Sequence, residues 1–600
     1  MKTIVSRLPA LLELPRRLEP VAIFLSGFLP FCNVRRFPPI AGFWGEWLAA
    51  VLFSLWILVR RWNSIEGWST ESPLSTLGLL AFALLVLVHA ATGKALYPSG
   101  AIVPVFLLGL AALVSREAVK LREHADRVLV PFAAGLIAAL VLNALSIVLG
   151  HLDVVIPYIQ LQSPAWHGRE MGLIAQPNHL GLLAVLAWAG ACYLRSSRRI
   201  SAWLNMGVTV IASLVCASTA SRTAFGVALI VSILHLFSAW RRRGDCSATG
   251  PCMSSRELIS ALVMFFAIQG AWLVQPPPPA IDSSEATAPL LRGGLESRVE
   301  MLRDAWLLGA QHPLFGVGFR NYGGARLFSL QGSMVEPNAS QAHNLIAQVW
   351  AEFGLLGFAC LAPILVAVAF AVVRFVKNAR WSPASTLALC WVLALLAHSM
   401  VEHPLWFAFF LLPFAMMLGL LPQPEIKRKH AGSAPRAVTV LGGLLALGLC
   451  GLAALDYMRS ERLALSVLFQ IRTNADHSAA IPRAETMRIA NLTLFPEAAE
   501  VMQLRAMALD NWLPDLKLEV AERAMRVLGH SETMSRYIGF LAIQKRDAEA
   551  SAFLAMIRKR SPETAAQIDQ DLRALASSNP LLQDFVASMS RPVLPQGGNR

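Results

Sequence analysis

Long apolar runs recur along roughly the first three quarters of the chain, separated by shorter polar links. A helix that crosses a bilayer needs roughly 17–25 mostly apolar residues. Thirteen runs have about this length, at 19–34, 42–59, 75–93, 99–115, 128–150, 173–194, 202–219, 223–240, 258–275, 345–373, 383–400, 404–421 and 437–457. The pattern predicts an all-α fold, a polytopic membrane helix bundle of about 13 spans.

The pattern changes after residue 457. There, amphipathic stretches of about 15 residues alternate with breakers such as Leu513–Pro514 and Ser561–Pro562. Charged side chains make up 56 of the first 457 residues but 34 of the last 143, and the second share is close to the roughly 25% of soluble domains. We expect a transmembrane domain at 1–457 and a soluble helical-hairpin domain at 458–600.

Composition narrows the class of protein. The chain is 55% hydrophobic and only 15% charged, which excludes a soluble globular enzyme, a fibrous protein and a disordered chain. Most of the net charge of +14 lies in the apolar part. Basic residues between spans orient a membrane protein, so this charge does not indicate nucleic-acid binding.

Basic residues gather in alternate links, which fixes a predicted topology. They are Arg60 and Arg61; Arg116, Lys120, Arg122 and Arg127; Arg195, Arg198 and Arg199; Arg241, Arg242, Arg243 and Arg256; Arg374, Lys377 and Arg380; and Lys427, Arg428 and Lys429. Such links belong in the cytoplasm. The N-terminus is then cytoplasmic, whereas the long loop at 276–344 and the C-terminal domain lie outside. Arg35 and Arg36 break the rule at the first hairpin.

Arginines on the outer side are candidates for anion binding. Arg222 stands in the short link between two spans, and Arg298 and Arg320 lie in the long loop. Guanidinium groups match phosphate oxygens with two parallel hydrogen bonds. Alternatively, Arg222 extends to a lipid headgroup phosphate. The two loop arginines could instead be ordinary surface charges of an amphipathic helix.

Histidines and carboxyl groups at the outer ends of spans form a second group of candidates. His343 ends the long loop and could exchange a proton near neutral pH. His398, Glu402 and His403 sit close together, but no further motif supplies metal ligands. We therefore expect hydrogen bonds that fix this turn rather than a metal site.

Five motifs together resemble the O-antigen ligase-like membrane glycosyltransferases, and most of all the bacterial protein O-oligosaccharyltransferases of the PglL type. They are Gln176-Pro177-Asn178-His179-Leu180-Gly181, Ser221-Arg222-Thr223, Pro313-Leu314-Phe315-Gly316-Val317-Gly318, His343-Asn344 with Glu352-Phe353-Gly354-Leu355-Leu356-Gly357, and Glu402-His403-Pro404-Leu405-Trp406. The resemblance spans roughly 160–425.

The resemblance implies transfer of an oligosaccharide from undecaprenyl pyrophosphate to serine or threonine hydroxyls of periplasmic proteins or pilins, outside the bacterial inner membrane. It implies His343 as the catalytic residue and Arg222 and Arg298 as ligands of the pyrophosphate, to which we add Arg320 from its place in the long loop. The supporting residues are Gln176, Asn178, Glu352, Glu402 and His403. PglL-type enzymes generally have tyrosine where this chain has His403.

Two other functions share the predicted scaffold. O-antigen ligases transfer to a sugar of the lipid A core, and O-antigen polymerases transfer to another glycan. The outer helical domain favours a protein acceptor by analogy only. A flippase would place polar groups near the bilayer midplane, whereas here they gather at span ends. We expect no cofactor and no metal, because a lipid pyrophosphate is already a good leaving group.

Overall fold

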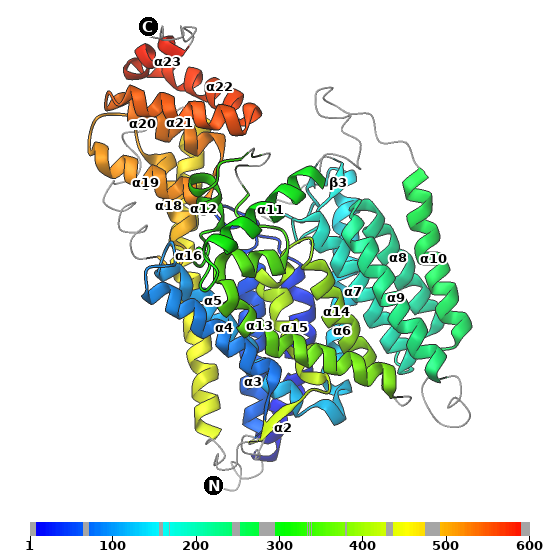
Figure 1. Ribbon diagram of the computed structural model, residues 1–600. Coiled ribbons are helices and arrows are strands. Elements are labelled where there is room, and N and C mark those ends of the chain that lie inside the picture. The colour runs from blue at the N-terminus through cyan, green and yellow to red at the C-terminus, as the bar shows by residue number, and fades with distance from the viewer. Residues whose placement is uncertain are drawn as a thin grey trace. The chain divides into compact units, whose positions relative to one another are not determined.

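The protein is helical apart from two short strand pairs (Figure 1). The computed structural model describes residues 8–63, 71–154, 160–166, 168–242, 253–274, 295–332, 334, 337, 339–378, 381–427, 436–473 and 493–589. Strand β1 (Glu71–Pro73) pairs antiparallel with β4 (Glu425–Lys427), and β2 (Ala165–Trp166) with β3 (Arg169–Glu170). The predicted all-α class is confirmed.

Each of the thirteen predicted ranges contains a helix. In the described part of the chain, eight helices are long and apolar enough to cross a membrane. They are α3 (Phe43–Asn63), α4 (Leu74–Ala91), α5 (Ile102–Val119), α6 (Asp126–His151), α7 (Pro177–Ser196), α9 (Arg222–Arg242), α13 (Leu345–Lys377) and α16 (Arg436–Thr473). Shorter apolar segments lie in α2 (Leu8–Phe28), α8 (Ala202–Ser218), α14 (Pro383–His398) and α15 (Ala408–Leu420), and α10 (Ser255–Val274) is in neither group. The number of spans stays a prediction.

The chain divides into two compact units. Unit 1 comprises Met1–Leu85, Val103–Asp282 and Ala359–Leu455, and unit 2 comprises Val86–Ile102, Ser283–Phe358 and Asp456–Arg600. The C-terminal helices therefore belong to the same unit as most of the long loop. The two predicted domains, 1–457 and 458–600, separate these segments.

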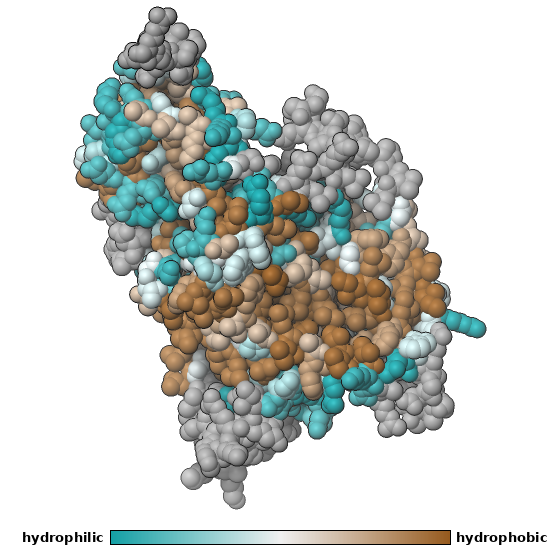
Figure 2. All heavy atoms as spheres, in the orientation of Figure 1, coloured by the Kyte–Doolittle hydropathy of each residue, from teal (hydrophilic) through white to brown (hydrophobic). Residues whose placement is uncertain are grey.

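Unit 1 is built around α7 and α15, whose side chains are enclosed on nearly every face by neighbouring helices. Gln176 caps the start of helix α7: its Oε1 accepts the His179 N–H at 2.6 Å, and Pro177 occupies the first helical position. Trp188 stacks on Phe265 of α10 with ring centroids 4.6 Å apart. Figure 2 shows hydrophobic residues gathered over α8, α9 and α10.

Unit 2 contains the loop helices α11 (Leu295–Gln311) and α12 (Tyr322–Ser329) and the C-terminal helices. The latter are α18 (Pro496–Ala506), α19 (Pro514–Val527), α20 (Ser531–Ile543), α21 (Asp547–Arg560), α22 (Pro562–Ser578) and α23 (Gln583–Met589). Proline occupies the first turn of α18, α19 and α22, so the predicted breakers start helices. Leu327 and Met334 of the loop share one apolar core with α20, α21 and α22.

Short 3₁₀ helices complete the structure. They are η1 (Leu29–Phe31), η2 (Ser99–Ala101), η3 (Arg122–His124), η4 (Pro404–Trp406) and η5 (Pro580–Leu582). Of these, η4 follows the polar turn that contains Glu402 and His403, and thereby bears on the candidate site.

Candidate functional site

Asn178 connects four segments of unit 1. Its Oδ1 accepts hydrogen bonds from Arg169 Nη2 at 2.9 Å and from Ser221 Oγ at 2.8 Å, and its Nδ2 donates to Glu402 Oε1 at 2.8 Å. Arg169 also donates through Nε to the Thr219 carbonyl at 2.8 Å. Both ends of one amide therefore hold together β3, the start of α7, the link before α9 and the turn after α14.

Arg222 is the first residue of α9 and is exposed. The preceding Ser221 is 6% exposed, and its Oγ accepts the Ala224 N–H at 3.2 Å while donating to Asn178. Ser221 thus caps α9. The cap fixes where the helix starts, and so fixes the position from which the guanidinium of Arg222 extends. An exposed arginine on a helix N-terminus can bind an anion.

Glu402 and His403 lie in the turn between α14 and η4. Glu402 is 5% exposed, and its Oε2 lies 3.8 Å from His403 Nδ1. Backbone N–H groups of Val401 and Glu402 both donate to the His398 carbonyl, at 3.1 and 2.9 Å. The ring of His403 stacks on Phe407 with centroids 5.9 Å apart. A buried carboxylate is therefore held by an amide on one side and an imidazole on the other.

His343 of unit 2 stands in a tight turn directly before α13. It is half-buried and has a φ of +50°, a conformation that few residues other than glycine adopt. The Ala342 N–H donates to Gln348 Oε1 at 2.7 Å, and the Ala347 N–H donates to Asn344 Oδ1 at 2.9 Å. Hydrogen bonds on both sides therefore fix this strained backbone, as is common at functional positions.

The two glycine-containing motifs of the long loop and α13 bind each other through their backbones. The Val317 and Gly318 N–H groups donate to the carbonyls of Ala351 and Glu352 at 2.8 and 3.1 Å, and the Leu355 N–H donates to the Pro313 carbonyl at 2.8 Å. These bonds are possible because α13 is interrupted at Gly354, which has a φ of +59°.

Glycine is required at this junction. A Cβ on Gly316, whose φ is +67°, would lie 2.2 Å from the Glu352 carbonyl carbon, and one on Gly354 would lie 2.5 Å from the Pro313 oxygen. The side chain of Glu352 is 2% exposed, and its Oε1 accepts the Tyr322 N–H at 3.2 Å. Glu352 therefore fixes the start of α12.

Comparison with known proteins identifies the chain at this point. Residues 207–362 match the family described as O-antigen ligase, a range that contains Arg222, the loop motifs and His343. Over this range the chain is similar to the O-antigen ligase-like superfamily. Residues 386–575 also match the family described as virulence factor membrane-bound polymerase, C-terminal. The resemblance drawn from the motifs is confirmed.

Within this superfamily, a general O-oligosaccharyltransferase of Acinetobacter baylyi is similar to the chain. The two are 23% identical over 293 residues, which cover 48% of this chain and 50% of the relative. The chain thus matches about half the length of that relative.

The predicted site residues are divided between the two units. Unit 1 contains Arg222 and the set Gln176, Asn178, Glu402 and His403, of which the structure joins Asn178 directly to Glu402. Unit 2 contains His343, Glu352, Arg298 and Arg320. Arg320 forms an ion pair with Glu497 of α18 at 2.6 Å. Their roles in binding and catalysis stay predictions.

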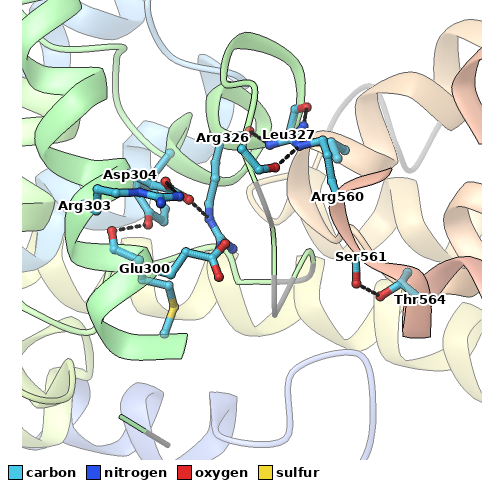
Figure 3. A network of polar contacts seen from close by, with 11 residues as sticks. Glu300, Arg303, Asp304, Arg326, Leu327, Arg560, Ser561 and Thr564 are labelled. Atoms are coloured by element: carbon cyan, nitrogen blue, oxygen red, sulfur yellow. Dashed lines mark hydrogen bonds and ion pairs between the residues drawn. The ribbon is translucent and has the colours of Figure 1, made fainter. Parts of the chain in front are cut away.

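A buried charge network in unit 2 escaped the sequence analysis (Figure 3). Arg326 of α12 is fully buried and donates to Asp304 Oδ2 at 2.7 Å and to Glu300 Oε1 at 3.0 Å, both on α11. Arg560 of α21 donates to the carbonyls of Arg326 and Leu327 at 3.0 and 2.6 Å. Glu300 and Asp304 are four residues apart on one helix face, a spacing that could have indicated a shared partner.

Proposed function

We propose that the protein transfers an oligosaccharide en bloc from undecaprenyl pyrophosphate to serine or threonine hydroxyls of a periplasmic protein or pilin, as a multi-pass protein of a bacterial inner membrane. The observation that carries this proposal is the similarity to a general O-oligosaccharyltransferase, together with the O-antigen ligase match over 207–362. The C-terminal helices then lie in the periplasm, as the positive-inside pattern predicts.

The chemistry that we propose needs two kinds of group. The bond between the sugar and the pyrophosphate breaks, and negative charge develops on the departing pyrophosphate, which arginines can stabilise. Arg222 and Arg298 are proposed for this role. Arg320 is the weaker candidate, since its guanidinium is paired with Glu497 at 2.6 Å. The hydroxyl of the acceptor forms the new bond and loses its proton, which His343 can accept.

A metal is not part of this proposal. The pyrophosphate leaves readily with arginine counter-charges, and the hydroxyl needs only a base that is positioned near it. Hydrogen bonds at Ala342 and Asn344 fix the turn that presents His343, which supports this role for the histidine. We expect transfer to continue in the presence of a chelator such as EDTA.

The second candidate function is transfer to another glycan. It is favoured by the match of residues 386–575 to the C-terminal part of a membrane-bound polymerase family. A ligase that uses lipid A core as its acceptor is a third possibility within the same superfamily. These functions share the donor and the leaving group, and they differ only in the hydroxyl that attacks.

The test is transfer in a bacterium that lacks its own ligase and is supplied with a lipid-linked glycan and a candidate pilin. Glycan on the protein, formed by the wild type but not by His343→Ala, would support both the class and the histidine. Glycan on lipopolysaccharide alone would indicate a ligase, and longer lipid-linked glycan chains would indicate a polymerase. Either of these results would contradict a protein acceptor.

A further inference from the structure

Helix α11 buries two carboxylates and exposes four large apolar side chains. Its buried face consists of residues that repeat every three or four positions, namely Ser297, Glu300, Met301, Asp304, Ala305 and Leu308. Two carboxylates thus lie on the inner face. A helix whose outer face meets water normally has the opposite arrangement, with apolar residues inside and charges outside.

The outer face of α11 carries four large apolar side chains. Val299 is 61% exposed, Leu302 38%, Trp306 66% and Leu307 43%. Together these four residues form what we term the α11 apolar face. Within the described helix, the exposed charged residue beside them is Arg303. Because contiguous exposed apolar surface is uncommon in water, it indicates an apolar partner.

The network around Arg326 holds the helix in this orientation. Arg326 donates to both inner carboxylates of α11, at 2.7 and 3.0 Å, and lies between them in Figure 3. Rotating α11 to hide Trp306 would separate these buried charges from their partner. Removing one partner from a buried ion pair costs roughly 3–5 kcal/mol. The apolar face therefore points outward because the charges fix the opposite side.

The α11 apolar face continues onto helix α13. The rings of Trp306 and Trp350 have centroids 5.7 Å apart, and Trp350 Nε1 donates to the Trp306 carbonyl at 3.2 Å. Trp350 in turn stacks on Phe358, with centroids 5.9 Å apart, and Leu355 is 55% exposed. Helix α13 is long and apolar enough to cross a membrane, so the exposed surface of α11 joins a surface suited to lipid.

We propose that α11 lies along the surface of the lipid bilayer, with Val299, Leu302, Trp306 and Leu307 inserted among the lipids. Two observations favour lipid over a protein partner: the continuity with α13, and the paired tryptophans, which are typical of membrane interfaces. The bilayer thereby holds one face of the helix while Arg326 holds the other. This membrane contact does not depend on the proposed transferase function.

The test measures the depth of α11 in vesicles of phosphatidylcholine and phosphatidylglycerol. The full-length protein, with its own cysteines replaced, carries a nitroxide spin label at Leu302→Cys or Trp306→Cys. The matched control is Ala566→Cys on an exposed position of α22. We expect the two α11 labels to lie roughly 5–10 Å into the boundary between headgroups and acyl chains, and the α22 label to contact water.

Three results would overturn the proposal. Labels on α11 as accessible to water as the label at Ala566→Cys would show that the helix does not enter the bilayer. Shielding that appears only after addition of undecaprenyl phosphate would assign the face to a polyprenyl chain. Shielding that appears only after addition of an acceptor protein would assign it to that protein.

The wild-type chain provides a second measurement if the cysteine-free variants do not fold. In vesicles that contain a phospholipid with a photoreactive acyl chain, we expect crosslinks on the peptide that spans 299–307. The peptide around Ala566 is the internal control. Crosslinks absent from 299–307 but present on α13 would contradict the proposal, because they would show that lipid reaches the span without contacting α11.

Discussion

Arg36 lies in a link that the charge pattern predicts to be outside, where basic residues are disfavoured. Its guanidinium donates to the carbonyls of Gly172, Gln160 and Gln162 at 2.9, 2.7 and 2.8 Å. Burial among these groups lowers the pKa of Arg36. The residue thus serves to join the first hairpin to the link before α7, and hydrogen bonds to carbonyls explain why the exception to the charge rule is tolerated.

His343 carries the first prediction at this scale. We expect His343→Ala to lower the rate of glycan transfer by about 10²–10⁴-fold, the contribution of a general base. The rate is measured with purified protein, lipid-linked glycan and acceptor in detergent. His312→Ala is the control, since His312 is an exposed histidine of the same loop. Transfer by His343→Ala within a few-fold of wild type would contradict the catalytic assignment.

Glu500 gives a prediction for pH dependence. Burial raises the pKa of this carboxyl to about 7, an effect that Arg523, 2.5 Å away, only partly offsets. The folded state therefore binds more protons than the unfolded state between the ordinary carboxyl pKa of about 4.3 and about 7. The free energy of unfolding of the C-terminal helices then falls as pH rises through this window, by on the order of 3 kcal/mol.

The measurement is proteolysis of the full-length protein in urea at pH 5 and at pH 8. The rate at which fragments from residues 493–589 appear reports the stability of the C-terminal helices. We expect Glu500→Gln to remove most of the difference between the two pH values. Glu563→Gln, at an exposed position of α22, is the control. An unchanged pH dependence in Glu500→Gln would show that another group is responsible.

At the scale of elements, the junction between the long loop and α13 depends on glycines with positive φ. The loop motif and the α13 motif were each recognised separately in the sequence, and the structure shows that they are the two sides of one backbone contact. The interruption at Gly354 frees N–H and carbonyl groups of α13, and the loop residues 313–318 satisfy them.

We therefore expect Gly316→Ala and Gly354→Ala to lower the stability of the protein by at least the ~1–3 kcal/mol that such a backbone conformation costs. The added Cβ also clashes with backbone atoms at 2.2 and 2.5 Å. Thermal unfolding in detergent measures the effect. Gly207→Ala on α8 is the control, because its Cβ would meet nothing within 4 Å. Equal melting temperatures in the three variants would contradict this explanation.

The network around Arg326 acts at the scale of a whole folding unit. It connects α11 to α12, and Arg560 extends it to α21, which lies more than two hundred residues farther along the chain. The Met334 N–H completes the contact by donating to the Arg560 carbonyl at 2.7 Å. We therefore expect unit 2 to unfold as one cooperative body, in which the C-terminal helices fix the loop that precedes His343.

Loss of this network should lower the stability of all the helices of unit 2 that it connects. We expect Arg326→Met to cost roughly 3–5 kcal/mol, since it removes the buried cation that Glu300 and Asp304 share. Hydrogen exchange should increase in α11, α12 and α21 together. Arg558→Met is the control, because Arg558 pairs with Asp569 at an exposed position, where such a pair is worth about 0–1 kcal/mol. Increased exchange confined to α12 would show that the unit is not cooperative.

The sequence by itself determined the helical class, the positions of the apolar helices and the superfamily. These features are local: a run of apolar residues, a proline at a helix start such as Pro514, or a short motif such as the one that contains His343 is visible without knowledge of the fold.

Only the tertiary structure decided which face of each helix is buried and which distant residues meet. In α11, Leu302 and Trp306 are exposed, whereas Glu300 and Asp304 are buried together with Ala305 and Leu308. The reason is Arg326, whose buried charge outweighs the local preference of α11 for an apolar core. Contacts such as Asn178 with Glu402, 224 residues apart, likewise depend on chain folding over long distances, which no local pattern encodes.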